Sequence, residues 1–440
     1  MGVPDVNLRT GRWAKFLALL FALSLVAAAC GGNADDDDDA STDDTEAPAE
    51  EEEGGGEPET GPGFDGTTIT LGVVTPQTGV AAVIGNPLTH GNQTYFDRLN
   101  AEGGVAGKYQ VKLEVVDSQY QGPVAVQQYN AVKGKVAAFV QILGTGVVNA
   151  ILPLLKTDNL VAGPASLDSF WVAEQQLMAL GAPYQLQAIN GMDWWVNQEG
   201  NADSKVCLMR QNDPYGEAGK EGLEFAGGEM DFEIAEDVTF AATDTEFGAQ
   251  VNRLKGAGCE LVFLVGLPSH TGGIMGTAAQ AAFEPQWIGM SPTWIGLLAA
   301  SGVGDYMAKN FVLMSEGPEW GDVSSEGMAQ MLEDVLAYGE DQVPDIYFAF
   351  GYAQAWSMAQ ILEKAVELGD LSREGIVKAM NEVGTISTGG LLGDYEYGAP
   401  GDRKFPRGSR VFNVDKASPG GLKAKTEQFT SAAAEAFELE

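Results

Sequence analysis

Glu260-Leu-Val-Phe-Leu-Val-Gly266 decides the fold, because five consecutive apolar residues end abruptly at a glycine. Such a run predicts a strand that is buried on both faces, as in a parallel sheet covered by helices. Helical patterns at 246–257 and 271–283 flank it, and another apolar strand is expected at 286–290. Alternation of strands with helices is typical of an α/β fold.

The same alternation continues in both directions and forms two series. The earlier series predicts strands, separated by helices, at 68–74, 110–116, 136–143 and 160–162. The later series predicts strands at 205–210, 233–240, 260–266, 286–290 and 311–315. Helices near 322–338, 346–368 and 372–382 follow, and we expect them to return to the first lobe. The predicted fold class is α/β, with two doubly wound parallel-sheet lobes.

The N-terminal segment predicts export from the cell. Residues 1–29 begin with basic side chains and continue in an apolar run that leads directly into Cys30. This is the pattern of a bacterial signal peptide followed by a lipidation site. A membrane span needs about 20 apolar residues, so the shorter run here is read as a signal that is removed. A short uncleaved anchor is the alternative, and both interpretations place the rest of the chain outside the cell.

The segment after Cys30 is strongly acidic. Residues 31–63 contain clustered Asp and Glu side chains and no Lys or Arg. Low hydrophobicity and charge of one sign disfavour a packed structure. We therefore expect residues 30–66 to form a lipidated, disordered tether.

The charge of the whole chain limits its partners. The formal net charge is −37, which disfavours nucleic acid and anionic lipid surfaces as partners. Beyond Cys30 the chain has two cysteines, Cys207 within one predicted strand and Cys259 just before another. In an oxidising compartment they form either a disulfide or two separate thiols.

The sequence offers few catalytic candidates. His90 and His270 are the only histidines, and two cannot make a convincing zinc cluster. Gly289-Met-Ser-Pro-Thr293 lacks the closing glycine of a nucleophile elbow. We therefore predict no enzyme activity, no catalytic residue, no metal and no cofactor. The alternative is a surface hydrolase that depends on Ser291 or His270.

Several ordered motifs resemble the branched-chain amino acid binding proteins, which are extracytoplasmic receptors of ABC importers with the type I periplasmic-binding-protein fold. The opening motifs are Leu71-Gly-Val-Val-Thr-Pro-Gln-Thr-Gly79 and Leu99-Asn-Ala-Glu-Gly-Gly-Val-Ala-Gly107. Later ones include Gln211-Asn-Asp-Pro-Tyr-Gly216, Thr243-Asp-Thr-Glu-Phe247 and Gly401-Asp-Arg403. The resemblance covers nearly all of the chain from residue 67 to about residue 415.

The resemblance implies two lobes joined by a three-segment hinge, with a solute bound in the cleft between them. The crossings are expected near 187–190, 314–317 and 390–395. The first lobe is then 67–187 plus 317–390, and the second is 188–316 plus 391–436. A membrane permease of an ABC importer is the implied partner, and a monomer is expected.

The family's contact positions can be carried onto this chain. They fall on Gln77, Thr78, Thr145, Gly146, Val147, Asn149, Ala165, Ser166, Leu167, Tyr215, Leu267, Ser269 and Ser291. The loop at 144–149 departs from the family pattern because Thr145 and Asn149 are its only polar side chains where serines are usual, and the loop at 266–270 lacks the usual aromatic pair. In addition, Leu167 stands at a threonine position and Ser291 at the position of the acidic partner of the ligand ammonium. An ammonium buried without an acidic partner is costly. The resemblance therefore favours an amide, a carboxylate without an amine, or a larger aromatic or aliphatic solute.

Two further residues are candidates from their position. Trp294 is the tryptophan we expect to stack on the solute, although most tryptophans here are expected to pack in the core. Glu316 lies at a predicted crossing, where it supplies a displaced acidic group or remains a solvated carboxylate. Tyr215 either contacts the solute or packs the first turn of its helix.

The sequence thus predicts a lipid-anchored extracytoplasmic solute-binding protein that delivers an amino acid or related small polar solute to a permease. A ligand sensor that signals without transport is a further alternative, and the residues do not separate it from the importer.

Overall fold

The computed structural model describes residues 58–339 and 344–438. The predicted signal peptide, Cys30 and most of the predicted tether lie outside these ranges. Within them, no helix combines the length and the apolar character that crossing a membrane requires.

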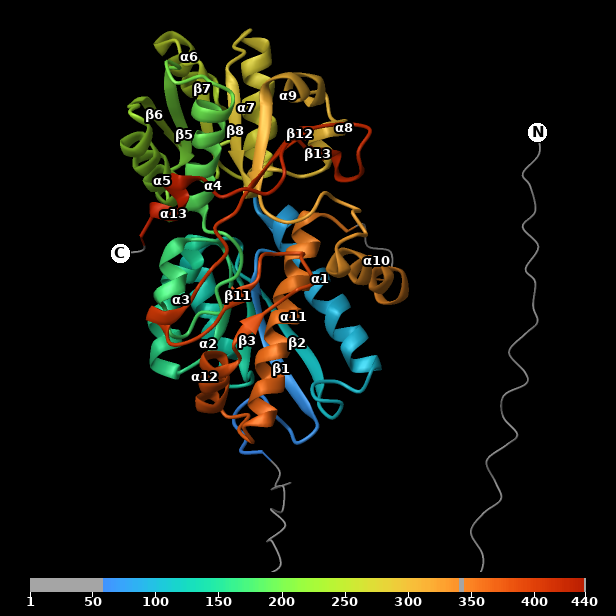
Figure 1. Ribbon diagram of the computed structural model, residues 1–440. Coiled ribbons are helices and arrows are strands. Elements are labelled where there is room, and N and C mark those ends of the chain that lie inside the picture. Colours follow the sequence, from blue (N-terminus) through green and yellow to red (C-terminus); the bar gives the residue numbers. More distant parts are fainter. Residues whose placement is uncertain (1–57, 340–343, 439–440) are drawn as a thin grey trace, which may run out of the picture. The chain divides into compact units, whose positions relative to one another are not determined.

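The first lobe is built on a four-stranded sheet, and all of its paired strands are parallel (Figure 1). Its order is β2 (Gln110–Asp117), β1 (Thr68–Thr75), β3 (Ala138–Leu143) and β4 (Ala162–Ala165). The connecting helices are α1 (Ala82–Ala101), α2 (Gly122–Val132) and α3 (Thr145–Asp158). Every residue of β3 is buried, as expected for a central strand covered on both faces.

The second lobe contains a seven-stranded sheet. Its parallel part comprises β5 (Val206–Gln211), β6 (Ile234–Phe240), β7 (Leu261–Val265), β8 (Gln286–Met290) and β9 (Phe311–Ser315). The longer helices between these strands are α5 (Pro214–Met230), α6 (Gly248–Ala257) and α7 (Pro268–Gln280), and the shorter ones are α8 (Leu297–Ala300) and α9 (Gly304–Asn310). The C-terminal segment adds β12 (Arg410–Val414) and β13 (Leu422–Ala424) as antiparallel strands, so this sheet is mixed rather than purely parallel. The last helix of the C-terminal segment is α13 (Ala432–Ala436).

The late helices return to the first lobe, as predicted. They are α10 (Glu326–Tyr338), α11 (Ile346–Glu367) and α12 (Arg373–Glu382), and most of their buried apolar residues belong to the core of the first sheet. A short hairpin of β10 (Thr385–Ile386) and β11 (Tyr395–Glu396) follows. Helix α11 packs closely along α1 because glycines stand at the contact. A Cβ on Gly351 would lie 1.9 Å from the carbonyl oxygen of Leu88, so only glycine fits there.

The two cores show where the chain passes between lobes. Leu180 belongs to the first core and Tyr184 to the second, so the first crossing precedes the predicted 187–190. Tyr397 still belongs to the first core and Val411 to the second, so the third crossing follows the predicted 390–395. The unpredicted helix α4 (Tyr184–Asp193) follows the first crossing directly.

The start of the described chain differs from the predicted tether, which was expected to extend to residue 66. Glu59 forms a parallel bridge with Asp370, and its N–H donates to Gly369 O at 2.9 Å. Phe64 packs edge-on against Tyr109, with ring centroids 5.2 Å apart. Aromatic burial and backbone pairing therefore fix residues 58–66 onto the first lobe.

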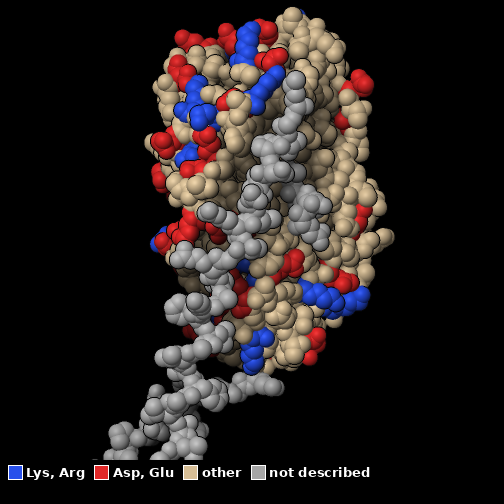
Figure 2. Space-filling view, turned by 90° about the vertical axis from the view of Figure 1, so that its right-hand side faces the viewer, with Lys and Arg blue, Asp and Glu red and all other residues tan. Residues whose placement is uncertain are grey.

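Charged side chains on the face shown in Figure 2 stand in separate groups in which acidic and basic residues mix. Neutral residues cover most of the described surface in this view. No broad basic patch is visible on this face of the described residues, in line with the acidic composition.

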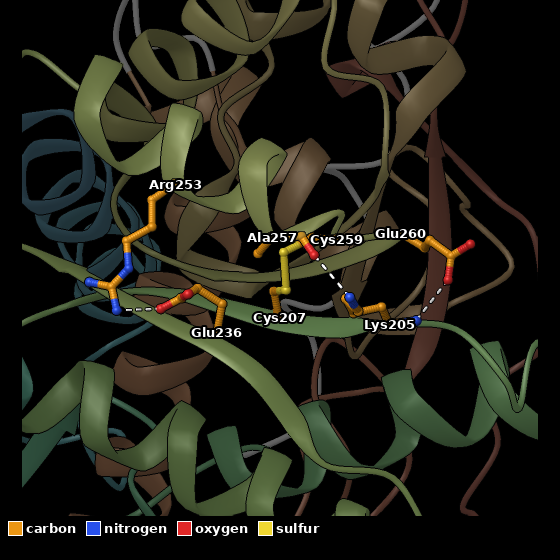
Figure 3. Close-up of a disulfide and its surroundings, with 7 residues drawn as sticks. All are labelled: Lys205, Cys207, Glu236, Arg253, Ala257, Cys259 and Glu260. Atoms are coloured by element: carbon orange, nitrogen blue, oxygen red, sulfur yellow. Dashed lines mark hydrogen bonds and ion pairs between the residues drawn. A yellow bond between two sulfur atoms is a disulfide. The ribbon is translucent and has the colours of Figure 1, made fainter.

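The two cysteines of the second lobe form a disulfide (Figure 3). Cys207 lies near the start of β5 and Cys259 just before β7, and these strands are parallel neighbours. Their Cα atoms are 5.9 Å apart. Nearby, the Lys205 N–H donates to Glu260 at 2.8 Å and its ammonium donates to Ala257 O at 3.0 Å. These contacts join β5 to β7 at the amino-terminal ends of the two strands, away from their carboxyl ends.

Candidate solute-binding site

A central cavity lies at the carboxyl ends of the strands of both sheets, where α/β folds place their ligands. It encloses about 1040 Å³ of space between atoms, part of it open to solvent. Residues at or just after the ends of β2, β3 and β4 line one side: Tyr120, Leu143, Gly144, Thr145, Ala165, Ser166 and Leu167. Residues at or just after the ends of β5, β7, β8 and β9 line the other: Tyr215, Leu267, Ser291, Pro292, Ser315, Glu316, Gly317 and Pro318.

Helices and connecting segments complete the cavity with a largely apolar wall. It comprises Ile84, Leu88, Tyr184, Gln187, Trp320, Met328, Ile346, Tyr347, Ala349, Phe350, Leu391 and Leu392. Among the described lining residues, Glu316 is the only Asp, Glu, Lys, Arg or His side chain. Apolar walls with few polar groups are typical of sites for small organic molecules.

The start of α3 provides the first polar region. Thr145 Oγ1 and Ser166 Oγ share a hydrogen bond of 2.7 Å, and Trp171 Nε1 donates to Ser166 at 3.2 Å. Gly144 precedes the helix with φ 104, and a Cβ there would lie 2.5 Å from the Tyr120 ring. Glycine thus lets the positive end of α3 approach the cavity, where it favours an acceptor or an anionic group.

Tyrosines form the second polar region and link the lobes. Tyr347, at the start of α11, donates its hydroxyl hydrogen to Trp294 O in the other lobe at 2.6 Å. Pro292 O is a second acceptor, 3.1 Å from the same hydroxyl oxygen. Tyr215 OH donates to Gly266 O at 3.3 Å and packs against Tyr184 with ring centroids 5.0 Å apart. Burial raises the pKa of both Tyr215 and Tyr347, so both remain hydrogen-bond donors at neutral pH.

Glu316 is the third polar feature and follows β9 at the second crossing. Its Oε1 accepts the Ala182 N–H at 2.9 Å, while its buried Oε2 has no hydrogen-bond partner among the described residues. Burial raises the pKa of Glu316 to about 7. Gly181 permits the approach, because a Cβ there would lie 2.1 Å from Oε1.

The structure brings many of the predicted site residues to this cavity. Those that line it are Thr145, Ala165, Ser166, Leu167, Tyr215, Leu267, Ser291 and Glu316. Gln77 and Thr78 are not among the lining residues, because they bind Asp117 instead, at 2.9 Å through the Gln77 N–H and at 2.6 Å through the Thr78 hydroxyl.

The remaining predicted residues also lie elsewhere. Val147 is buried in the first core, and Gly146 and Ser269 are exposed outside the lining. Trp294 is 1% exposed, donates from Nε1 to Gly420 O at 3.2 Å and lines a smaller cavity of about 510 Å³. That smaller cavity shares Glu316 and Trp320 with the central one.

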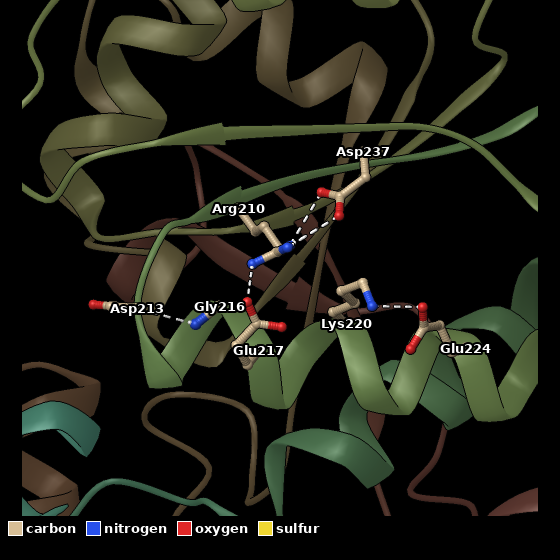
Figure 4. Close-up of polar contacts among 7 residues, drawn as sticks. All are labelled: Arg210, Asp213, Gly216, Glu217, Lys220, Glu224 and Asp237. Carbon is tan, nitrogen blue, oxygen red and sulfur yellow. Dashed lines mark hydrogen bonds and ion pairs between the residues drawn. The ribbon is translucent and has the colours of Figure 1, made fainter.

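Asn149 lines a separate acidic crevice between α3 and α5. Its charged lining residues are Asp168, Asp213, Glu217, Lys220, Glu221 and Glu224. Beside it, Arg210 contacts Glu217 at 2.8 Å and Asp237 at 3.0 Å, and Lys220 pairs with Glu224 at 2.6 Å (Figure 4). Asp213 caps α5 by accepting the Gly216 N–H at 3.0 Å.

Sequence reasoning missed the helical side of the central cavity. Leu88, Tyr347 and Phe350 occupy apolar positions of α1 and α11 that also suit a buried core. Leu391 and Leu392 carried the one usable signal, since they lie within a predicted crossing.

His270 has a structural role in the second lobe. The Leu267 N–H donates to its Nδ1 at 3.1 Å, and its Nε2 lies 2.9 Å from Ala242 O, so both ring nitrogens are engaged. Burial lowers its pKa, which favours the neutral ring. Within the described ranges, no group of three or more His, Cys, Asp or Glu side chains is arranged to hold a metal ion.

Comparison with known families agrees with this geometry. The family model described as "Periplasmic binding protein" matches residues 68–419. The chain belongs to this family. It is a periplasmic binding protein with an extracytoplasmic location, and the family predicted from the sequence is confirmed.

Individual relatives are distant but cover most of the chain. Leu/Ile/Val-binding protein homolog 1 of Brucella abortus (strain 2308) is 24% identical over 360 residues, which span 80% of this chain and 92% of the relative. A fatty acid ABC transporter substrate-binding protein from Thermomonospora curvata superposes with a TM-score of 0.80 at 23% identity, covering 86% of this chain and 97% of its own. A branched chain amino acid ABC transporter from Thermus thermophilus with bound valine superposes with a TM-score of 0.74 at 19% identity. The superposition covers 84% of this chain and 98% of the Thermus thermophilus chain. These likenesses confirm the type I periplasmic-binding-protein fold.

Proposed function

We propose that this chain is the membrane-anchored solute receptor of an ABC importer, which binds one small organic molecule between its lobes and delivers it to a permease. The carrying observation is the central cavity, which is built from the strand ends of both sheets. Tyr347 bonds across it from α11 to the loop after β8, so closure of the lobes and occupation of the cavity are physically coupled.

The composition of the wall supports a predominantly apolar solute with few polar groups. Ser291 provides no acidic partner, and its own N–H donates to Gln187 Oε1 at 3.0 Å. Relatives whose names refer to Leu/Ile/Val and to fatty acid are in line with such a solute.

The anchor and the partner complete the proposal. Cys30 carries the lipid, the acidic segment after it spaces the lobes from the membrane, and the permease recognises the closed monomer. The hydrolase alternative has weaker support, because His270 uses both ring nitrogens within the fold. No enzymatic activity is proposed.

A binding screen tests the proposal. We expect apolar carboxylic acids, amides or amines to raise the melting temperature of the mature chain, since binding at 100 times Kd stabilises by about 2.7 kcal/mol. Tyr347→Phe removes the cross-lobe hydrogen bond and should weaken binding, whereas exposed Leu336→Ala serves as a matched control. If no member of a broad panel changes either melting temperature or tryptophan fluorescence, the receptor function is wrong.

The anchor requires its own experiment. Expression of Cys30→Ser should release the protein from the membrane fraction and abolish incorporation of labelled palmitate. Retention of Cys30→Ser in the membrane would instead favour the uncleaved N-terminal anchor.

A further inference from the structure

Glu316 lies where the segments that join the lobes converge. The side chain comes from the second crossing, and its Oε1 is held by Ala182 N–H within the first. A Cβ on Gly393, near the third segment, would lie 3.8 Å from Oε2. The same carboxyl group lines both the central cavity and the smaller one beside it.

The carboxyl group has an unused hydrogen-bonding atom. Oε2 is buried without a hydrogen-bond partner among the described residues, and the nearby Gly393 N–H influences the pKa without reaching hydrogen-bond geometry. No Lys, Arg or His is among the described lining residues of either cavity. A buried carboxylate in this condition must be protonated or meet an external donor.

Three donors of the cavity wall are committed elsewhere. Tyr347 OH donates to Trp294 O, Tyr215 OH donates to Gly266 O, and Gln187 Nε2 donates to Ala182 O at 3.2 Å. These bonds leave Oε2 without a side-chain donor among the described residues, and the Gly393 N–H is the protein donor that lies near it. A donor on the bound solute would complete its hydrogen bonding.

We propose that Glu316 is a specificity-determining residue whose Oε2 accepts a hydrogen bond from an N–H group of an apolar solute, best an ammonium. The inference rests on the proposed function and names the polar group that this receptor selects. An ammonium against a buried carboxylate forms a charge-assisted hydrogen bond, which is stronger than the bond from a neutral amide. The acidic partner is thus displaced from position 291 to the hinge.

The position of Glu316 at the hinge gives its contact with the solute a second consequence. The carboxyl group already joins the first and second crossings through Ala182 N–H. A donor on Oε2 therefore binds the solute to segments whose backbone must turn when the lobes close. Selection of the solute and closure of the lobes depend on the same side chain.

Three solutes with one branched alkyl chain test the proposal: isohexylamine, isocaproamide and isocaproic acid. They are titrated calorimetrically into the wild-type mature chain, Glu316→Gln and the control Asp345→Asn. Asp345 is a second acid that lines the smaller cavity, where it caps α11, and it is not among the described lining residues of the central one. Each variant is checked by its melting curve before titration.

We expect the wild type to bind the amine at least about tenfold tighter than the acid, with the amide between them. Glu316→Gln should weaken amine binding by about tenfold or more and leave the acid unchanged or improved. The Asp345→Asn control should keep the amine-to-acid ratio within about threefold of the wild type.

Equal or tighter binding of the acid by the wild type overturns the proposal, and this comparison needs no variant. Retention of the amine preference by folded Glu316→Gln overturns it as well. If the solute that binds best in a broad screen has no N–H group, the proposal for Glu316 is wrong, while the receptor function stands. Absence of any binding solute removes the receptor function itself.

Discussion

The central cavity and the acidic crevice draw on the same loops but differ completely in charge. After β4, residues 165–167 line the cavity, whereas Asp168 and Phe170 line the crevice. After β5, Tyr215 lines the cavity, whereas Asp213 lines the crevice. In both loops the acidic residue lines the crevice, and its uncharged neighbours line the cavity. The comparison teaches that a net charge of −37 describes the solvated surface and not the ligand.

The largest expected effect comes from placing a charge in the cavity wall. Leu88 is 2% exposed and packs at the contact of α1 with α11. Leu88→Asp buries a carboxylate without a partner and should destabilise the fold by about 4 kcal/mol and abolish solute binding. Urea denaturation and calorimetric titration measure both effects. Leu88→Met is the matched control, and an equal loss in both variants would contradict the charge argument.

The second prediction concerns the one carboxyl group that the cavity tolerates. The folded pKa of Glu316 is about 7 against the ordinary 4.5, so the folded state binds more protons between these values. The contribution of Glu316 to stability should therefore be greatest below about pH 4.5 and fall as the pH rises through 7, by at most about 3 kcal/mol.

Glu316→Gln removes that dependence and should be more stable than the wild type at pH 8 but not at pH 5. Asp345, whose pKa burial raises to about 6, adds a loss in the same direction that this variant retains. Chemical denaturation at the two pH values provides the measurement. If the free energy of unfolding changed equally with pH in wild type and variant, ionisation of Glu316 would not destabilise the folded state, and the prediction would be wrong.

A smaller effect is expected for the ion pairs beside the crevice. Arg210 is 7% exposed, while its partners Asp237 and Glu217 are more accessible to water. Arg210→Met should cost about 2 kcal/mol, less than a fully buried pair, because both carboxylates regain hydration. The change is read from the denaturation midpoint, and solute affinity should stay unchanged. A loss of affinity would show that the crevice and the cavity are coupled.

The smallest effect is expected on the open side of the crevice. Lys220 pairs with Glu224 one helical turn away at 2.6 Å, and both side chains are accessible to water. Lys220→Ala should change stability by no more than about 0.5 kcal/mol. Its melting temperature at low and high salt provides the check. A large loss would mean that the crevice is less solvated than its exposure indicates.

The order of strands and helices was largely predictable, because each parallel strand is a short apolar run between polar turns. Helix α4 was not, since every residue from Tyr184 to Met192 is buried and no amphipathic period remains in the sequence. The antiparallel β12 and β13 were also missed as sheet members. Strand β12 pairs with β9 across about a hundred residues of sequence, and local pattern carries no information on such pairing. Strand β13 joins the sheet only through β12.

The site residues likewise fall into those that the sequence pattern predicts and those that it does not. Thr145, Ser166, Tyr215 and Ser291 were predictable because parallel strands converge at their carboxyl ends. Tyr347 and Phe350 were not, because an apolar helix position looks the same whether it faces a core or a cavity. Trp294 lies at a strand end but bonds to Gly420, a distant residue that sequence spacing does not reveal, and this contact places it beside the smaller cavity.

The attachment of residues 58–66 has a mechanical consequence. Backbone bonds from Glu59 to Gly369 and Leu371 join this segment to the first lobe. Any pull that reaches Pro58 along the chain is therefore borne by one lobe and exerts no torque across the hinge. Under the proposed anchoring, affinity for the proposed solute should then be insensitive to the number of residues that precede Pro58, and the second lobe remains free to move.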